Sequence, residues 1–298
     1  MSGTYNDASF DREYESRWSG VGEDAFFKPE MFDSKRVLNQ PEYEGQKKLG
    51  NKGYYIFAVD VGRKADSTEI IVFKVKPQAQ GQSIKDIVNI FSYQGLHFET
   101  QAIILKRLYF KFKPKKIVID TNGVGIGLVD YLVKAQTDPQ TGDLLPAFGV
   151  DNDDDKIYKQ YKTPDMITDI LYLIKATAQM NSDMHALVQM QLSSGKIRLL
   201  IDERSAKYKL LETKVGKAMT PEQRGEYLKP FTLTSVLREQ LLNLVESHEG
   251  LNIVLKKSNN KIQKDKFSAL EMGLYYIKLT EDSKKKKRVD ISKFMFYT

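Results

Sequence analysis

The sequence predicts an α/β fold, in which a mixed sheet of three antiparallel strands followed by parallel strands is flanked by helices. Residues 54–59 and 116–119 are dominated by apolar side chains, a pattern typical of central strands covered on both faces. Between them, segments 68–75 and 84–94 are spaced as the second and third strands of an antiparallel meander. After the meander, helical and strand patterns alternate along the chain.

The later elements follow in order from their residues. Residues 99–112 place apolar side chains at helical intervals and stop before Pro114, and a fourth strand follows at 116–120. Pro164 predicts the start of a long helix, because proline suits a first helical turn. Residues 213–230 predict a flexible, polar and basic loop. The other expected elements are helices at 127–136, 163–191, 235–247 and 266–279, and strands at 146–150, 196–201 and 251–255.

This order places the first and fourth strands side by side and parallel, which is the connectivity of a ribonuclease-H-like sheet. We expect residues 51–283 to form that domain. Residues 1–50 predict an arm or linker that packs its aromatic side chains on the domain. Residues 284–298 begin with five consecutive bases and predict a basic, solvated tail that follows the last helix.

Composition narrows the classes of function. The 298 residues carry a formal net charge of +7, although residues 1–50 hold ten acids and seven bases, so the body of the chain is strongly basic. A basic body favours a polyanionic partner such as nucleic acid. The absence of cysteine excludes disulfides, zinc–thiolate sites and cysteine nucleophiles. No apolar run reaches eighteen residues, so we expect no membrane span.

Aspartates end both predicted central strands. Asp60 follows the first apolar run and Asp120 follows the fourth strand. Sites in α/β sheets form at the carboxyl ends of parallel strands, so these carboxylates are expected to lie about 5 Å apart at their backbones. Such a pair repels itself unless a cation neutralises it, and hard oxygen ligands suit Mg²⁺ or Mn²⁺. Taken singly, each aspartate also fits a plain turn residue.

A third acid would complete a site that binds two metal ions. Asp265 precedes an apolar helical run and is surrounded by bases, although a helix cap alone would also account for it. Bases near these acids could hold a phosphate backbone, and a solvated loop is the alternative for the run at 256–266. The predicted DNA-binding bases are Arg63, Lys64, Lys256, Lys257, Lys261, Lys264 and Lys266.

Three motifs together resemble a known family. Residues 55–62 (YIFAVDVG), 117–128 (IVIDTNGVGIGL) and 264–270 (KDKFSAL), in that order, resemble the nuclease domain of tailed-bacteriophage large terminase subunits. Residues 7–15, together with Phe26-Phe27 and the run at 35–38, are similar to the segment that joins the terminase motor to its nuclease.

The resemblance implies an endonuclease that cuts concatemeric double-stranded viral DNA with two Mg²⁺ or Mn²⁺ ions. It implies that Asp60, Asp120 and Asp265 bind the metal and that Asp66 is an accessory acid. It further implies three protein partners, namely the terminase ATPase portion, the small terminase subunit and the portal protein. The location would be the host cytoplasm, and transiently the procapsid portal. The chain has no G-x-x-x-x-G-K-[ST] motif, so we expect no ATP hydrolysis by that motif.

Two other functions stay open from the residues alone. One is a nuclease of the same fold that resolves Holliday junctions, and the other is a catalytically silent module that binds DNA or docks on the portal. A dinucleotide site at Gly123, Gly125 and Gly127 is disfavoured, because the spacing is G-x-G-x-G and the preceding strand is not the first of a βαβ unit. We interpret this segment as a tight turn that brings the backbone close to Asp120.

Overall fold

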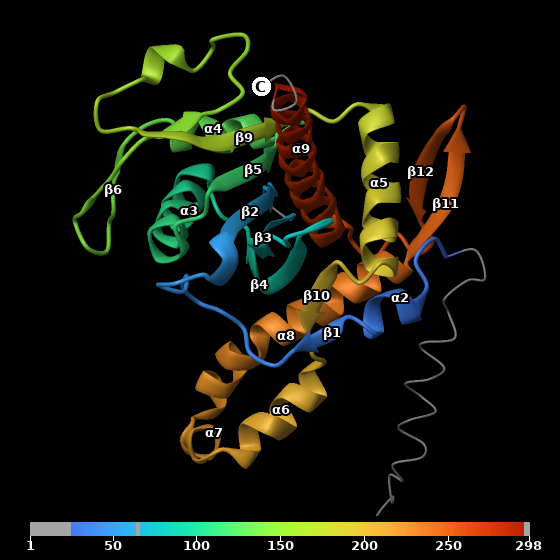
Figure 1. Cartoon of the computed structure of the whole chain (residues 1–298). Helices are drawn as coiled ribbons and strands as arrows, with labels where there is room; N and C mark the ends of the chain where they lie inside the picture. The colour runs from blue at the N-terminus through green and yellow to red at the C-terminus, as the bar shows by residue number, and fades with distance from the viewer. Residues whose placement is uncertain (1–24, 64–65, 295–298) are drawn as a thin grey trace, which may run out of the picture.

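The computed structural model describes residues 25–63 and 66–294, apart from the side chains of residue 51 and of residues 285–294 (Figure 1). Its centre is an eight-stranded sheet. In order across the sheet, the strands are β1 (Arg36–Leu38), β10 (Ile197–Leu200), β4 (Ile84–Gln94), β3 (Ser67–Lys76), β2 (Tyr54–Asp60), β5 (Lys116–Asp120), β9 (Ile167–Ile174) and β8 (Phe148–Val150).

The pairing of these strands confirms the predicted mixed sheet. β2, β3 and β4 form an antiparallel meander, and β5 lies parallel to β2 with Val59 opposite Ile119. β9 continues the parallel part beside β5. The first and fourth strands of the domain are therefore adjacent and parallel, which is the ribonuclease-H-like order. Their carboxyl ends, at Asp60 and Asp120, meet at one edge of the sheet.

Helices cover both faces of the sheet, which explains the continuous apolar run of β2. Ile56 and Ala58 are buried in one core, while Phe57 and Val59 are buried in the other. The first core lies under α5 (Ala178–Ser193), α8 (Pro221–Leu242) and α9 (Asp265–Phe294), and the second under α3 (Phe98–Phe112) and α4 (Gly125–Leu132). Figure 1 shows α9 between the sheet and α5, and α9 contacts β2, β3 and β5.

Shorter elements complete the described part of the chain. An antiparallel hairpin of β11 and β12 packs against α5, and α6 and α7 project with the start of α8 away from the sheet (Figure 1). The bounds of these and the remaining elements are α2 (Pro29–Asp33), β6 (Gln136–Thr137), β7 (Leu144–Leu145), α6 (Glu203–Glu212), α7 (Lys214–Ala218), β11 (Leu244–Glu249), β12 (Asn252–Lys257) and 3₁₀ turns at Gly50–Lys52 and Lys159–Tyr161.

The segment before the domain packs on it from residue 25 onward. Phe26, Phe27 and Phe32 are buried in the first core, and β1 pairs with β10 at the edge of the sheet. These three aromatic side chains thus pack on the domain, as the sequence predicted. The other predicted arm aromatics, Phe10, Tyr14 and Trp18, and residues 7–15 lie outside the described residues. The division at residues 50 and 283 stays a prediction.

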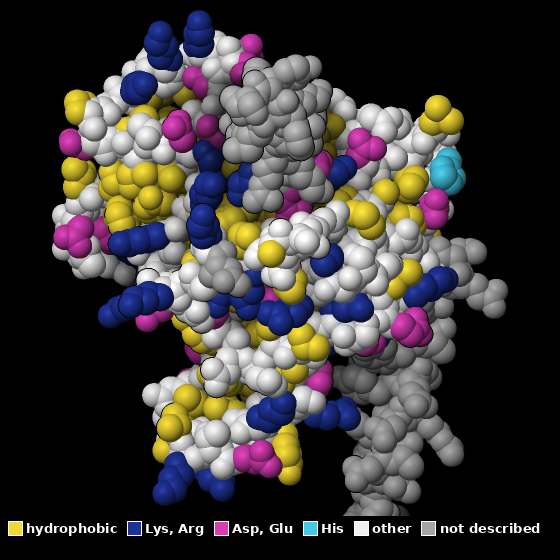
Figure 2. Space-filling view, viewed as in Figure 1, with side chains coloured by type: hydrophobic (Ala, Val, Ile, Leu, Met, Phe, Trp, Pro, Cys, Tyr) yellow, Lys and Arg dark blue, Asp and Glu magenta, His cyan; other side chains and the backbone are white. Residues whose placement is uncertain are grey.

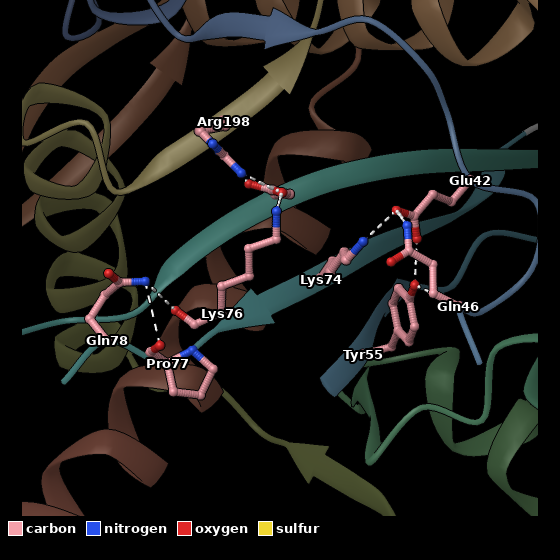
Figure 3. A network of polar contacts seen from close by, with 9 residues as sticks. Glu42, Gln46, Tyr55, Lys74, Lys76, Pro77, Gln78 and Arg198 are labelled. Atoms are coloured by element: carbon pink, nitrogen blue, oxygen red, sulfur yellow. Dashed lines mark hydrogen bonds and ion pairs between the residues drawn. The ribbon is translucent and has the colours of Figure 1, made fainter. Parts of the chain in front are cut away.

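Polar contacts fasten this segment and the sheet edge (Figure 3). Glu42 accepts hydrogen bonds from Lys74 Nζ at 2.7 Å and from the Tyr55 hydroxyl, so residues 42–46 lie against β2 and β3. Across the sheet, Arg198 of β10 binds both oxygens of Asp86 on β4, at 2.6 and 2.8 Å. Charged hydrogen bonds of this two-pronged kind fix geometry as well as adding stability. This contact holds the short strand β10 beside β4.

Three predicted elements are wrong. Residues 163–191 are not one helix: β9 occupies the first half, and α5 begins only after Thr177, whose hydroxyl accepts a hydrogen bond from the Met180 amide at 3.2 Å. Residues 213–230 are not a flexible loop, because they form α7 and the start of α8. A capping box between Thr220 and Gln223 begins α8. Residues 284–288 do not follow the last helix, because α9 continues through them to Phe294.

None of the helices in the described part of the chain combines the length and apolarity that a bilayer span needs.

Candidate functional site

Three elements bring the predicted acids to one edge of the sheet. Asp60 and Asp120 are the last residues of the parallel neighbours β2 and β5, and both are half-buried. Asp265 is the first residue of α9, which crosses the face of these strands. The Asp120 carboxylate accepts a hydrogen bond from the Asn122 amide at 2.8 Å. The fold therefore brings acids that lie up to 205 positions apart in the sequence to the same edge of the sheet.

The pKa values of these three aspartates indicate that their carboxylates are neighbours. The pKa of Asp60 is raised well above its ordinary value of 3.8, first by burial and then by the negative charges of Asp265 and Asp120. Burial also raises the pKa of Asp120 and of Asp265. Asp66, the predicted accessory acid, adds to the rise at Asp265, so it lies near that carboxylate. Asp60 is thus the centre of a cluster of partly uncompensated negative charges.

Two further acids of the cluster were missed from the sequence. Glu69 lies opposite Asp60 in the β2–β3 pairing and is 1% exposed, and Glu271 lies on α9 and is 7% exposed. Both contribute to the raised pKa of Asp60. The pairing of the first hairpin is a signal for Glu69, since residues opposite each other share one face of a sheet. Glu271 offers no such local signal, because its position depends on how α9 packs.

Glu271 lies in a cavity of about 380 Å³ that opens beside Asp120, between α5, β12 and α9. Asn122 and Lys264 also line this cavity. The Glu271 carboxylate also contacts His185 of α5, whose Nδ1 lies 2.7 Å from Glu271 Oε2. The sequence gave no ligand role to His185, and the structure shows it as a buried partner of a carboxylate. Asp120 lines the same cavity.

The predicted DNA-binding bases differ in how exposed they are and in how close they lie to Asp265. Lys256, Lys261 and Lys264 are exposed, and Lys257 and Lys264 lie close enough to Asp265 to lower its pKa. Arg63 is exposed, with its guanidinium 5.2 Å from the centre of the Phe98 ring. In Figure 2, Lys and Arg side chains gather across the middle of the visible face. Lys64 lies outside the described residues.

The assignment of Lys266 to DNA is wrong. Its side chain is 7% exposed, and its Nζ lies 2.7 Å from Glu69 Oε1 in a buried ion pair. A base committed in this way to an interior carboxylate cannot reach a phosphate in solvent. The sequence misleads here because Lys264 and Lys266 flank the same aspartate, while the helix directs only one of them inward.

The donors fit a hard divalent cation by their chemistry. Asp60, Asp120 and Asp265 offer only carboxylate oxygens, which suit Mg²⁺ or Mn²⁺. Within residues 25–63 and 66–294, no group of three or more His, Asp or Glu side chains is already arranged so that it could hold a metal ion. The pKa of Asp60 is raised first by burial and then by the neighbouring negative charges, and a cation would neutralise those charges.

The glycine-rich turn after β5 brings backbone against the site, as the sequence predicted. A Cβ atom added at Gly125 would lie 1.7 Å from the carbonyl oxygen of Asp120, and Gly123 has a φ of +85°.

We therefore expect Gly125→Ala to displace Asp120. The substitution should lower the melting temperature, and it should reduce any DNA cleavage rate at least tenfold. Gly225→Ala is the matched control, because nothing lies within 4 Å of the added atom in α8. It should be neutral or stabilise by up to about 1 kcal/mol. Equal effects of the two substitutions on melting and cleavage would contradict the close approach.

Comparisons with known proteins give solved structures only. No family model matches the chain, and no curated protein matches it. The similar solved structures include large terminase nuclease domains from several phages. The large terminase nuclease of the thermophilic phage G20c with bound magnesium is 13% identical, with 82% of this chain and 96% of that chain covered and a TM-score of 0.44.

The nuclease domain of the large terminase subunit of the bacterial virus Sf6 is 11% identical, with 82% of this chain and 96% of that chain covered and a TM-score of 0.44. The large terminase of bacteriophage HK97 is 8% identical, with a TM-score of 0.42. The match covers 92% of this chain and 51% of the HK97 protein, so this chain corresponds to about half of that length.

Proposed function

We propose that this chain is a divalent-metal-dependent endonuclease that cuts double-stranded DNA. The observation that carries the proposal is the cluster of Asp60, Asp120 and Asp265 at the ends of β2 and β5 and the start of α9. A fold that gathers buried carboxylates whose charges disfavour one another loses stability unless a ligand compensates them. Divalent cations are that ligand for an all-oxygen donor set.

Each residue of the site has a role in this reaction. Asp60, Asp120 and Asp265 bind Mg²⁺ or Mn²⁺, with Asp66 as an accessory acid near Asp265. The bound ions supply Lewis-acid activation of water and neutralise negative charge on the phosphate. Lys264, exposed beside Asp265 and in the cavity with Asp120, is placed to contact the phosphate backbone.

The packaging context rests on the sequence motifs at 55–62, 117–128 and 264–270. They support a nuclease that cuts concatemeric viral DNA, with residues 51–283 as the nuclease domain. On the same ground we infer that it works with a terminase ATPase portion, a small terminase subunit and a portal protein. The setting would be the host cytoplasm and, transiently, the procapsid portal.

A plasmid-nicking assay tests the activity. We expect supercoiled plasmid to be nicked and linearised with Mg²⁺ or Mn²⁺ and to stay intact with EDTA. Linear duplex should be cut as readily as a four-way junction of the same length. A folded protein that binds DNA but leaves it intact under every metal condition would contradict the proposal and favour a silent DNA-binding module. A strong preference for the junction would favour a resolvase.

The exposed bases beside Asp265 should contribute salt-dependent affinity for DNA. Each phosphate contact releases a counterion, so neutralising two contacts should make the slope of log K against log salt shallower by up to about 2. We expect this for Lys261→Gln combined with Lys264→Gln, measured by fluorescence anisotropy on a labelled duplex. Lys47→Gln combined with Lys48→Gln removes the same charge from exposed positions in the segment before the sheet. Equal slopes for both double variants would place the DNA elsewhere.

A further inference from the structure

A buried ion pair joins β3 to the first turn of α9, directly behind the carboxylate cluster. Lys266 Nζ lies 2.7 Å from Glu69 Oε1, and the side chains are 7% and 1% exposed. The Ser92 hydroxyl of β4 donates to the same carboxylate oxygen at 2.8 Å. The consecutive strands β3 and β4 and the distant helix α9 are thus tied together at one carboxylate.

Stability alone does not explain this pair. Burying two charges costs several kcal/mol per ion in desolvation, and well-packed apolar side chains often stabilise a core equally well or better. The cost is higher here because Glu69 Oε2 is buried without a hydrogen-bond partner among the described residues. Glu69 also lies opposite Asp60 and adds to its negative surroundings. The arrangement therefore calls for a role at the site.

The position of Lys266 indicates that role. It follows Asp265 in the first turn of α9, so fixing the lysine side chain also fixes the start of the helix. Its charge counteracts the repulsion that Asp265 meets from the other acids, since Lys266 lowers the pKa of Asp265. The same turn has a second attachment, because the Phe267 amide donates to Gln240 Oε1 of α8 at 3.1 Å. That attachment supports the fold of α9 when the ion pair is removed.

We propose that Glu69 and Lys266 are positioning residues that hold Asp265 beside Asp60 for metal binding. The ion pair between Lys266 and Glu69 ties the first turn of α9 to β3, which is fixed within the sheet. Asp265 is thereby kept close to carboxylates that would otherwise repel it. This role rests on the proposed function, because the divalent ion is what Asp265 is held in place to bind.

Titration of the full chain with MnCl₂ in a calorimeter, without DNA, tests the proposal. Removing the lysine charge by Lys266→Met makes the site more negative, so an electrostatic role alone predicts tighter Mn²⁺ binding. Loss of positioning predicts the opposite sign, and we expect binding at least tenfold weaker. Combining Lys266→Met with Glu69→Gln keeps the formal charge constant and leaves no unpaired charge at position 69, and it should also bind at least tenfold more weakly.

Matched variants complete the experiment. Lys278→Met removes an exposed lysine from the same helix and should bind Mn²⁺ like the wild type. Lys266→Arg keeps a charged donor and should recover part of the affinity. Circular dichroism melting, run alongside each titration, shows that the titrated protein is folded.

Each outcome is decisive. Unchanged or tighter Mn²⁺ binding in either variant that folds, with wild-type binding intact, would overturn the positioning role and leave the proposed function standing. Failure of both variants to fold would show that the pair is structural and would also overturn it. A folded wild type that binds no Mn²⁺ would remove the proposed function and this role together.

Discussion

Asp60→Asn and Asp120→Asn should each reduce metal-dependent DNA cleavage at least a hundredfold while leaving the fold intact. Both residues end central strands, and amide substitution removes a charged oxygen ligand with almost no change in side-chain volume. Cleavage of supercoiled plasmid with Mn²⁺, timed under single-turnover conditions, measures the loss. Asp143→Asn, at an exposed turn between β6 and β7, is the matched control and should cut like the wild type.

The same substitutions should stabilise the metal-free protein near neutral pH. The folded-state pKa of Asp60 is raised, so folding favours its protonated form. Its stabilising contribution is present below the unfolded-state pKa of about 3.9 and is lost as pH rises through the raised folded pKa. At pH 7, above the unfolded-state pKa, folding must either bury the ionised carboxylate or protonate it, and Asp60→Asn removes that cost.

The melting temperature of metal-free Asp60→Asn should exceed that of the wild type at pH 7, and the difference should shrink as the pH falls toward 4. Mn²⁺ should raise the melting temperature of the wild type more than that of the variant, because a ligand that binds only the folded state stabilises it. Wild-type cleavage rates in both aspartate variants would contradict the site. A lower melting temperature for Asp60→Asn at pH 7 would contradict the charge repulsion.

Asp265→Ser should abolish cleavage to a similar extent with almost no effect on stability. Asp265 begins α9, and its carboxylate makes no hydrogen bond or ion pair among the described residues, so serine removes the metal ligand without breaking a contact. Serine is also well tolerated at helix starts. We expect the free energy of unfolding in urea to change by no more than about 0.5 kcal/mol.

Asp130→Ser, at an exposed position on α4, controls for the removal of an acid from a helix. It should cut DNA normally. Normal cleavage by Asp265→Ser would show that the third ligand lies elsewhere, and Glu271, the other acid of α9 near Asp60, would be the next residue to replace.

Local sequence patterns were sufficient to predict the centre of the fold. The apolar run before Asp60 and the run before Asp120 identify two strands covered on both faces, and the elements between them predict that these two strands are parallel neighbours. Because parallel neighbours end at the same edge, the proximity of the two aspartates follows as well. The spacing of the apolar residues and the length of each run predict these strands, and both can be recognised within a single stretch of sequence.

The region after Pro164 shows where local patterns are ambiguous. Ile167, Ile170, Leu171 and Ile174 have the i, i+3, i+4, i+7 spacing of a helix face, yet they form β9. Pairing with β5 on one side and β8 on the other decides the conformation, and such pairing is a long-range interaction that the spacing does not encode. By contrast, the helix start at Thr220 and Gln223 has a local capping signal that the sequence does contain.

The sequence by itself predicted that the first and fourth strands of the domain lie side by side and parallel, and it identified the three aspartates and the bases near them in the chain. Only the tertiary structure decided that Lys266 points inward to Glu69 while Lys264 stays exposed, and that Glu271 joins the cluster with His185. The physical reason is the difference in range. A strand or helix pattern is set by neighbours along the chain, whereas the burial of a charged side chain depends on which distant group compensates it, and that partner exists only once the elements have packed.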